Sequence, residues 1–383
     1  MTGLAMKHVL PLIAAMMMAL AGCSDNEPPK NTAAKQVSGD PAAGKALAER
    51  ECKACHGLDG RGVAPAIPTL AGQRERYLVT ALNEYRDGKR AHAALREISS
   101  RISDADVRNL AAYFAGLPAM PPESAKHVQL FSPYDNGKKL AGPCISCHGE
   151  NGNSKTPGTP SLAGQQPRYF VTAVQEYLNG AREASPMHTF VRDMSRLDLE
   201  SIGLYFASQE SAQRVPAAKG NATAAEKQVV LCAGCHGPGG VSDDTATPTL
   251  AGQDAEYLSQ AIAAYRKARR HEPMQRAVAG LSDADIENIA AYYSMQKSKP
   301  AENELTLIKE ITAQCDRCHS SEVDNPALVV PRLRGQDADY LTMALRSYRD
   351  NRRQSSMMHN VSWPYGDAVI EAIATFYASQ PPK

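Results

Sequence analysis

The pentapeptide C-x-x-C-H occurs four times, and this repetition constrains the fold of the chain more than any other feature of its sequence. The copies lie at residues 52–56, 144–148, 232–236 and 315–319. Two thiols at this spacing can each add to one vinyl group of a porphyrin, and the histidine that follows then lies beneath the iron. A zinc ribbon would leave the histidines surplus, and a disulfide framework predicts no histidine after every second cysteine. We therefore predict four covalently bound haem c groups.

Each predicted haem is attached through two thioether bonds and one imidazole. The cysteines that form the thioether bonds are Cys52, Cys55, Cys144, Cys147, Cys232, Cys235, Cys315 and Cys318. The proximal iron ligands are His56, His148, His236 and His319. These side chains predict four equivalent haem sites along the chain.

A second marker indicates that the motifs belong to an internal repeat. The sequence Pro-x-Leu-x-Gly-Gln begins at Pro68, Pro160, Pro248 and Pro331, at the same distance from each motif. We predict four domains, numbered here as repeats one to four, with the bounds 40–119, 125–210, 218–297 and 303–383. The segments between the repeats are short and polar, with the proline and lysine typical of linkers, which predicts that neighbouring domains pack together.

The repeats are predicted to be helical throughout. In repeat one the positions i, i+3, i+4 and i+7 of a helix are held by Leu78, Ala81, Leu82 and Tyr85, which is one apolar face. We call the equivalent positions of the four repeats a column. The tyrosine column, which contains Tyr85, is expected to pack in the core or at the haem edge. Residues 103–106 and 282–285 resemble capping boxes that open a further helix. Because no strand pattern competes, the predicted fold class is all-α.

A second axial ligand is expected between the middle and last helices of each repeat, and methionine is a common choice. Met187 and Met274 occupy the same column of the repeat, and each follows a proline. In repeat four, counting back from the last helix gives Met358, whereas counting forward from Arg352 and Arg353 gives Met357. We prefer Met358, because the dipeptide Met-His is then shared with repeat two.

Repeat one departs from this pattern, because Leu95 holds the methionine column. One alternative is that His92 turns to the iron, and another is that the iron site is open. His271 occupies the column of His92 in a repeat that has its methionine, so the position tolerates a surface histidine. Met120, beyond the last helix, is a third and more remote alternative.

The N-terminal residues carry a targeting signal. A positive charge followed by an apolar run over residues 1–22 is typical of a signal peptide. The run ends in Leu-Ala-Gly-Cys, which resembles a bacterial lipobox and predicts lipidation of Cys23; a simple signal peptide with a chance cysteine is the alternative. The run is too short to span a bilayer. Residues 23–39 lack periodicity and are expected to form a flexible tether, so we expect a lipid-anchored protein on the periplasmic side of a bacterial membrane.

The charge balance argues against one class of partner. The chain has 383 residues, with 42 Lys and Arg against 41 Asp and Glu, for a formal net charge of +1. No strongly basic surface is implied, so we expect no nucleic-acid partner.

With these motifs in hand, each repeat resembles a class I cytochrome c domain. The combination of C-x-x-C-H-Gly, the Pro-x-Leu-Ala-Gly-Gln marker and an axial methionine is similar to cytochrome c4 and its relatives, which pair two such domains. The resemblance implies two c4-like pairs in tandem over residues 40–383. It also implies that the marker proline carbonyl accepts a hydrogen bond from the proximal histidine. Besides Leu95, the departures are Ser320 in place of glycine and Arg334 in place of alanine.

Two functions of different class follow. The first is a membrane-tethered carrier, not an enzyme. The tether follows from the predicted lipid anchor, and three methionine-ligated irons would leave no site for chemistry. The resemblance implies that the carrier passes electrons between respiratory complexes, for example to a terminal oxidase or reductase. The alternative is a redox enzyme, or the cytochrome subunit of a dehydrogenase or reductase, in which haem one binds a small molecule. Leu95 is the sequence observation that favours the alternative.

Overall fold

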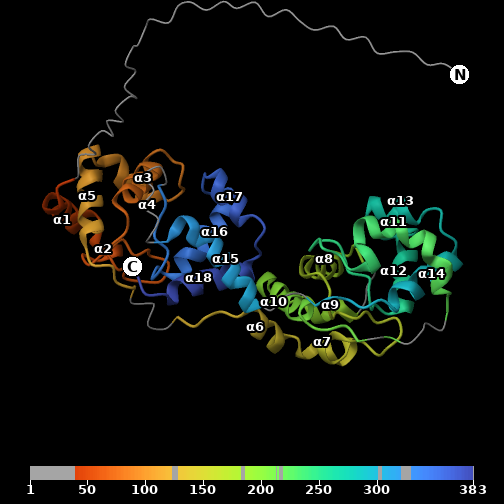
Figure 1. Cartoon of the computed structure of the whole chain (residues 1–383). Helices are drawn as coiled ribbons and strands as arrows, with labels where there is room; N and C mark the ends of the chain where they lie inside the picture. The colour runs from red at the N-terminus through yellow and green to blue at the C-terminus, as the bar shows by residue number, and fades with distance from the viewer. Residues whose placement is uncertain are drawn as a thin grey trace, which may run out of the picture. The chain divides into compact units, whose positions relative to one another are not determined.

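Each of the four repeats folds into a similar succession of α-helices, which Figure 1 labels along the computed structural model. The structure describes residues 39–122, 128–182, 186–212, 214, 219–300, 304–320 and 329–382. The predicted signal peptide and the predicted lipidation site Cys23 lie outside these residues, as does all but the last residue of the predicted tether. The described residues from Gly39 onward belong to one compact unit.

The helices keep the same order in every repeat. Repeat one contains α1 (Pro41–Glu51), α2 (Lys53–His56), α3 (Glu75–Arg86), α4 (Ala93–Arg101) and α5 (Asp104–Gly116). Repeat two contains α6 (Pro133–Leu140), α7 (Gly142–His148), α8 (Pro167–Leu178), α9 (Pro186–Val191) and α10 (Arg196–Ala207). Repeat three contains α11 (Glu226–His236), α12 (Ala255–Tyr265), α13 (Glu272–Val278) and α14 (Asp283–Ser294). Repeat four contains α15 (Glu304–His319), α16 (Ala338–Arg349), α17 (Ser356–Ser362) and α18 (Asp367–Ser379).

The all-α prediction is confirmed. Short 3-10 turns and one isolated bridge are the only other regular features of the described residues. Both predicted capping boxes form, at Ser103 and Ser282, and a third at Ser195 was not predicted. In each, the serine hydroxyl accepts a hydrogen bond from the backbone of an aspartate three residues on, whose carboxylate accepts from the serine backbone. These boxes fix where the last helix of three repeats begins.

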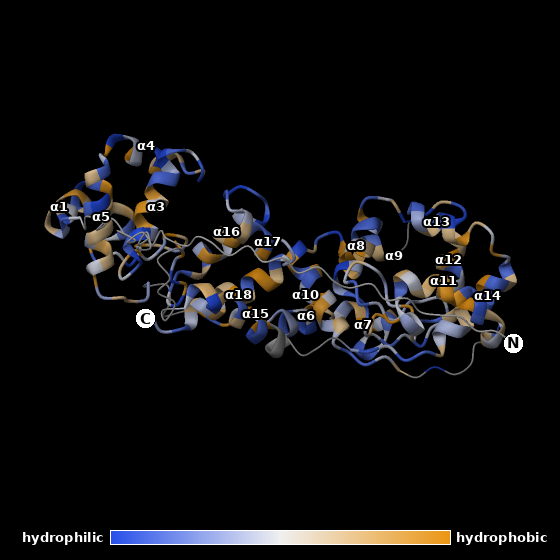
Figure 2. Cartoon of the chain, turned by 45° about the horizontal axis from the view of Figure 1, so that its top comes forward, coloured by the Kyte–Doolittle hydropathy of each residue, from blue (hydrophilic) through white to orange (hydrophobic). Residues whose placement is uncertain are grey.

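Each repeat has its own hydrophobic core, built mainly from the apolar faces of its helices. One aromatic residue of the last helix is almost completely buried in every core, namely Phe114, Phe206, Tyr293 or Tyr377. Figure 2 shows hydrophobic and hydrophilic stretches alternating around helices such as α3 and α14, as expected for helices with one buried face. None of the described helices is long and apolar enough to cross a membrane.

The repeats do form two pairs, but the pairs are nested rather than in tandem. Repeat two packs against repeat three, where the Tyr169 amide donates to the Thr245 carbonyl at 2.9 Å. Repeat one packs against repeat four, where Arg90 and Arg353 form an isolated antiparallel bridge. The predicted tandem order is therefore corrected, because the first repeat pairs with the last.

A difference between the repeats disfavours the tandem pairing. The residue after the marker glutamine is an aspartate in repeats three and four but not in repeats one and two. Asp254 accepts a hydrogen bond from the Gly158 amide at 2.8 Å, and Asp337 accepts one from the Ala66 amide at 2.9 Å. Each pair thus joins one repeat that supplies the aspartate to one that supplies the amide, which pairing repeats one with two, or three with four, would not achieve.

Candidate haem sites

The four C-x-x-C-H motifs lie at the C-terminal ends of helices, and all eight of their thiols are free. The first cysteine of each motif packs against the core of its own repeat: Cys52, Cys144, Cys232 and Cys315. Burial raises the pKa of each of these thiols, that of Cys52 to about 11. The second cysteine is more exposed in repeats one to three. In these three repeats the motif therefore offers one thiol against the core and a second toward the surface.

The four motif histidines make the same hydrogen bond. The ring Nδ1 lies against a marker proline carbonyl at 3.1 Å for His56 and Pro68, 2.8 Å for His148 and Pro160, 2.8 Å for His236 and Pro248, and 2.9 Å for His319 and Pro331. A carbonyl can only accept, so Nδ1 carries the proton and donates. The other nitrogen, Nε2, is then the unprotonated one, which is the form that binds a metal.

Burial keeps these imidazoles neutral. It lowers the pKa of all four histidines, and the proline carbonyl opposes this effect only in part. The donor set at each motif is thus two free thiols and one neutral imidazole with a fixed tautomer. This set fits haem c, which needs two thiols for its vinyl groups and one imidazole for its iron.

The backbone turns sharply after the histidine in three repeats. Gly57, Gly149 and Gly237 all have positive φ, at 69°, 80° and 77°. A Cβ added at Gly237 would lie 1.9 Å from the Val241 carbonyl oxygen, so an alanine would not fit. Ser320 replaces this glycine in repeat four, and the following residues lie outside the described part of the chain.

Two of the predicted axial methionines pack against the same core as the first cysteine of their motif. Met187, on α9, packs against the same core as Cys144, and Met274, on α13, packs against the same core as Cys232. In repeats two and three a methionine and a cysteine distant in sequence thus border one common core. Ligation of iron by Met187 and Met274 remains a prediction.

The structure favours the register that selects Met358. The side chain of Ser355 caps α17 by accepting from the Met358 amide at 3.3 Å, and the ring of His92 caps α4 by accepting from the Leu95 amide at 3.3 Å. Met358 and Leu95 therefore hold the same position of their helices. Met358 is half-buried, whereas Met357 is 56% exposed.

The position of His92 is that of a helix cap. Its Nδ1 accepts from the Leu95 amide, and its ring contacts Tyr85 edge-on at 6.1 Å. His271 makes the same kind of contact with Tyr265 at 6.4 Å in repeat three. The two histidines thus share the tyrosine contact, whereas only the ring of His92 caps its helix. Leu95, which is half-buried, holds the methionine column. Met120 is 42% exposed beyond α5.

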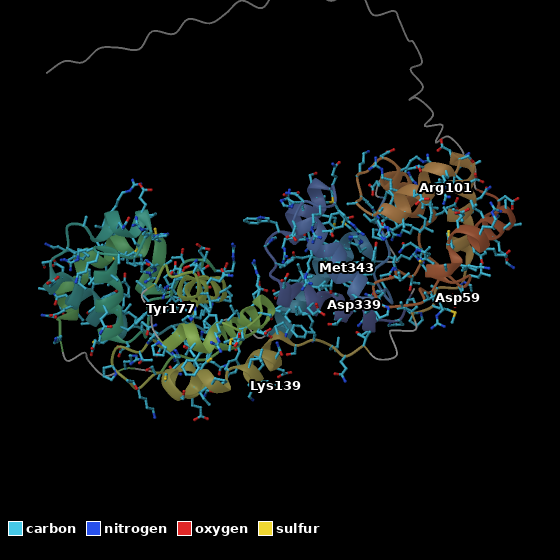
Figure 3. All side chains as sticks on the ribbon, turned by 180° about the vertical axis from the view of Figure 1, so that it is seen from behind. Asp59, Arg101, Lys139, Tyr177, Asp339 and Met343 are labelled. Carbon is cyan, nitrogen blue, oxygen red and sulfur yellow. The ribbon has the colours of Figure 1, made fainter. Side chains whose placement is uncertain are left out.

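Tyr265, from the column predicted to pack in the core or at the haem edge, packs against the core of repeat three. Tyr169, which lies outside that column, contacts the paired repeat instead. The Tyr169 hydroxyl accepts hydrogen bonds from Arg182 of its own repeat at 3.2 Å and from Arg269 of repeat three at 3.4 Å. Arg182 also lies over the ring of Tyr177 at 5.2 Å, a residue that Figure 3 labels among the side chains. Arg269 lies over the ring of Tyr265 at 4.5 Å, and burial raises the pKa of this phenol to about 12.

The marker glutamines are a feature whose role the sequence alone did not reveal. Each is more than nine-tenths buried: Gln73, Gln165, Gln253 and Gln336. Each side-chain amide bonds the backbone of the paired repeat, where its Oε1 accepts an N–H and its Nε2 donates to a carbonyl. The signal that could have identified them is an invariant amide side chain in all four markers.

Comparison with known proteins supports the same assignment. The family model described as cytochrome c matches residues 41–118, 134–196 and 217–295. Cytochrome c4 of Pseudomonas aeruginosa is 34% identical over 186 residues, which are 45% of this chain and 90% of that protein. Cytochrome c4 of Azotobacter vinelandii is 32% identical over 192 residues, again 45% of this chain and 91% of that protein.

The chain is also similar to two other proteins. A protein of Thiomonas intermedia described as a thiosulfate dehydrogenase electron acceptor is 30% identical over 172 residues, which are 41% of this chain and 78% of that protein. The solved structure of reduced cytochrome c4 from Pseudomonas stutzeri is 29% identical, with a TM-score of 0.38, over 43% of this chain and 98% of that one.

Proposed function

Because the chain belongs to the cytochrome c family and is similar to cytochrome c4, we propose that it is a tetrahaem electron carrier. The observation that carries the proposal is the fourfold recurrence of one donor set. Every motif has two free thiols and an imidazole whose Nδ1 donates to a marker proline carbonyl. Bound there, haem c supplies an iron that changes oxidation state by one electron.

The residues of the chain have distinct roles at each site. The cysteine pairs hold the haem covalently, and His56, His148, His236 and His319 bind the iron through Nε2. The proline carbonyl fixes the imidazole ring and raises its basicity. We propose Met187, Met274 and Met358 as second axial ligands, and four domains with the bounds predicted from the sequence.

The haem count has a direct test. The intact, denatured protein, expressed with the haem attachment machinery, should have the mass of the processed chain plus four haems. The double variant Cys232→Ala, Cys235→Ala should carry one haem fewer, with the other motifs still occupied. Fewer than four haems on the unmodified chain would contradict the proposal.

The comparisons suggest the class of electron donor. Since one relative is described as accepting electrons from a thiosulfate dehydrogenase, a dehydrogenase of that class is a candidate donor, and a respiratory oxidase or reductase is a candidate acceptor. Thiosulfate alone should leave the oxidised protein unchanged, whereas thiosulfate with such a dehydrogenase should reduce it. Reduction by thiosulfate alone would make the chain an enzyme.

A periplasmic location and a lipid anchor at Cys23 complete the proposal. The lipobox-like sequence before Cys23 supports the anchor, and covalent haem fits export because bacteria attach haem c outside the cytoplasm. Cys23→Ala should release the protein into the soluble periplasmic fraction or block its processing. If the variant is processed normally and remains in the membrane, the anchor lies elsewhere.

The second candidate function is that of a redox enzyme whose haem one binds a small molecule. It is favoured by Leu95, which holds the methionine column in repeat one, and by His92, whose Nδ1 caps α4. We propose that haem one has an open iron position. Turnover of peroxide or nitrite at this haem, absent from a Leu95→Met variant, would establish the enzyme.

A further inference from the structure

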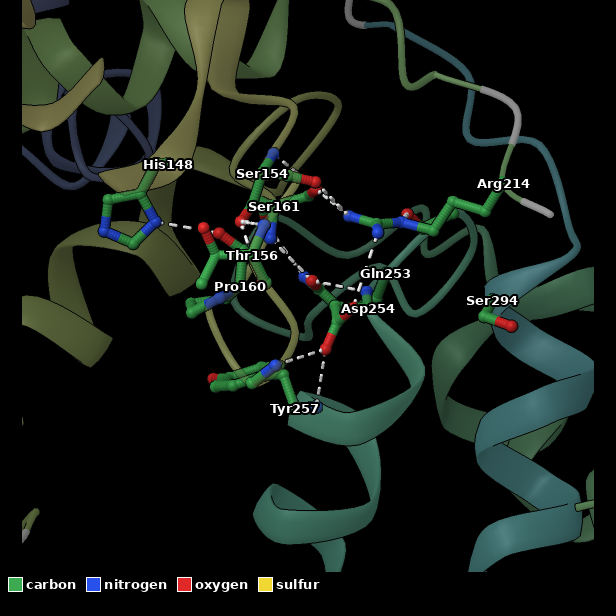
Figure 4. Close-up of polar contacts among 12 residues, drawn as sticks. His148, Ser154, Thr156, Pro160, Ser161, Arg214, Gln253, Asp254, Tyr257 and Ser294 are labelled. Carbon is green, nitrogen blue, oxygen red and sulfur yellow. Dashed lines mark hydrogen bonds and ion pairs between the residues drawn. The ribbon is translucent and has the colours of Figure 1, made fainter. Parts of the chain in front are cut away.

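The marker glutamine of one repeat contacts the peptide that holds the proximal histidine of the other. Figure 4 shows this arrangement for repeats two and three. The Pro160 carbonyl lies 2.8 Å from His148 Nδ1, and the amide of the next residue, Ser161, donates to Gln253 Oε1 at 2.6 Å. Carbonyl and amide belong to the same peptide group, so His148 and Gln253 are bonded to its two ends.

The same geometry recurs in the opposite direction. The Pro248 carbonyl lies 2.8 Å from His236 Nδ1, and the Thr249 amide donates to Gln165 Oε1 at 2.9 Å. Repeats one and four have it as well. Thr69, after Pro68, donates to Gln336 at 2.7 Å, and Arg332, after Pro331, donates to Gln73 at 2.8 Å.

These contacts are built rather than incidental. Each glutamine is at most 8% exposed, and its Oε1 also accepts from the amide of the next residue in its own repeat, at 2.8 to 2.9 Å. The Nε2 of each glutamine donates to a carbonyl of the paired repeat, and this carbonyl belongs to the same residue whose amide donates to the Oε1. For Gln165 that residue is Thr249, whose carbonyl accepts at 3.0 Å. The side-chain amide is therefore fixed in one orientation, with both ends satisfied.

We propose that each marker glutamine is a positioning residue for the haem of the paired repeat, and so tunes the potential of a haem to which its own repeat is not attached. A hydrogen bond accepted from a peptide N–H polarises that peptide and makes its carbonyl oxygen a better acceptor. The carbonyl then draws the histidine Nδ1 proton more strongly, which makes the imidazole a stronger donor to iron. A more basic ligand favours the oxidised iron and lowers its potential.

The inference rests on the proposed function, because it requires a haem at each motif, and it adds a specific connectivity. Gln165 acts on haem three, Gln253 on haem two, Gln336 on haem one and Gln73 on haem four. The nested pairs therefore couple haem one to haem four and haem two to haem three.

The test compares two adjacent glutamines on the fully loaded protein. Gln165→Met keeps the length of the side chain but loses the acceptor for the Thr249 amide. Gln166→Met is the matched control, because Gln166 Nε2 also bonds repeat three, at the Ser242 carbonyl, but not the Pro248–Thr249 peptide. The readouts are the potential of each haem and the proton shift of each proximal Nδ1–H, measured by nuclear magnetic resonance.

For Gln165→Met we expect haem three to shift to higher potential and the His236 Nδ1–H signal to move upfield, with haem two unchanged. The control should leave haem three where it was, and Gln253→Met should move haem two instead. Three results would overturn the inference: a shift of haem two in Gln165→Met, equal shifts of haem three in Gln165→Met and Gln166→Met, or no shift of haem three in Gln165→Met. Each of them would leave the four-haem carrier intact.

A further variant keeps the test valid if Gln165→Met does not fold. Gln165→Glu retains an acceptor oxygen and adds negative charge, so haem three should shift to lower potential, opposite in sign to the methionine variant. A shift to higher potential would contradict the proposed direction of tuning. Loss of haem from the unmodified chain would instead contradict the proposed function.

Discussion

The carboxylate of Glu200 in repeat two accepts a hydrogen bond from the backbone amide of Ala368 in repeat four at 3.0 Å. Ala368 lies in the first turn of α18, where the amides have no partner within the helix. Because a helix N-terminus carries partial positive charge, it favours a carboxylate. This contact joins the two nested pairs, together with the hydrogen bond from the Phe131 amide to the Thr375 hydroxyl at 3.0 Å.

Replacing Glu200 should loosen the start of α18. Glu200→Ala removes both the acceptor and the negative charge, and contacts of this kind contribute about 0.3–1 kcal/mol each, up to about 2 kcal/mol when partly buried. Amide hydrogen exchange should become faster in the first turn of α18. Arg196→Ala is the control, because it removes the partner of Glu200 but keeps the hydrogen bond to Ala368. Equal acceleration in both variants would mean that the Ala368 contact contributes nothing.

Leu95 should give haem one the lowest potential of the four. A thioether ligand stabilises reduced iron and raises the potential, and a leucine cannot supply one. Leu95→Met should therefore raise the potential of haem one toward the others, as followed by a spectroscopic redox titration. The reverse substitution Met187→Leu should lower the potential of haem two. Unchanged potentials in both variants would show that this column of the repeat holds no iron ligand.

His92 should act as a helix cap and not as a ligand. The reduced protein should bind carbon monoxide at one haem, because only an open iron position responds to it. His92→Ala should leave this spectral change as it is, while destabilising α4 by about 0.5–2 kcal/mol, as for loss of other capping side chains. If carbon monoxide binds only after His92→Ala, His92 occupies the iron and the open site is ruled out.

The sequence was sufficient to predict the local structure of the repeats. Spacing at i, i+3, i+4 and i+7 predicted α3, and two of the three capping boxes were visible as Ser-Asp-Ala-Asp. The third begins Ser195-Arg196-Leu197-Asp198, which has the same capping residues around different central ones. Helix positions follow from local periodicity and capping, and these are properties of neighbouring residues.

The pairing of the repeats was not predictable in the same way. Contacts such as that between Thr69 and Gln336 join residues from opposite ends of the chain, and periodicity carries no information about them. The resemblance to a two-domain family favoured neighbours as partners. The aspartate at 254 and 337, absent from the equivalent positions of repeats one and two, was the available signal against pairing one with two and three with four. It becomes interpretable only when the amide that it binds is known.

The capacity of this chain to take up and return four electrons is tested most directly by an anaerobic coulometric titration of the purified protein. Four haem sites of one kind predict that four electrons per chain are taken up on reduction and recovered on oxidation, over a range of potentials with one haem below the rest. Fewer than four electrons, or electrons that are not returned on oxidation, would contradict the account.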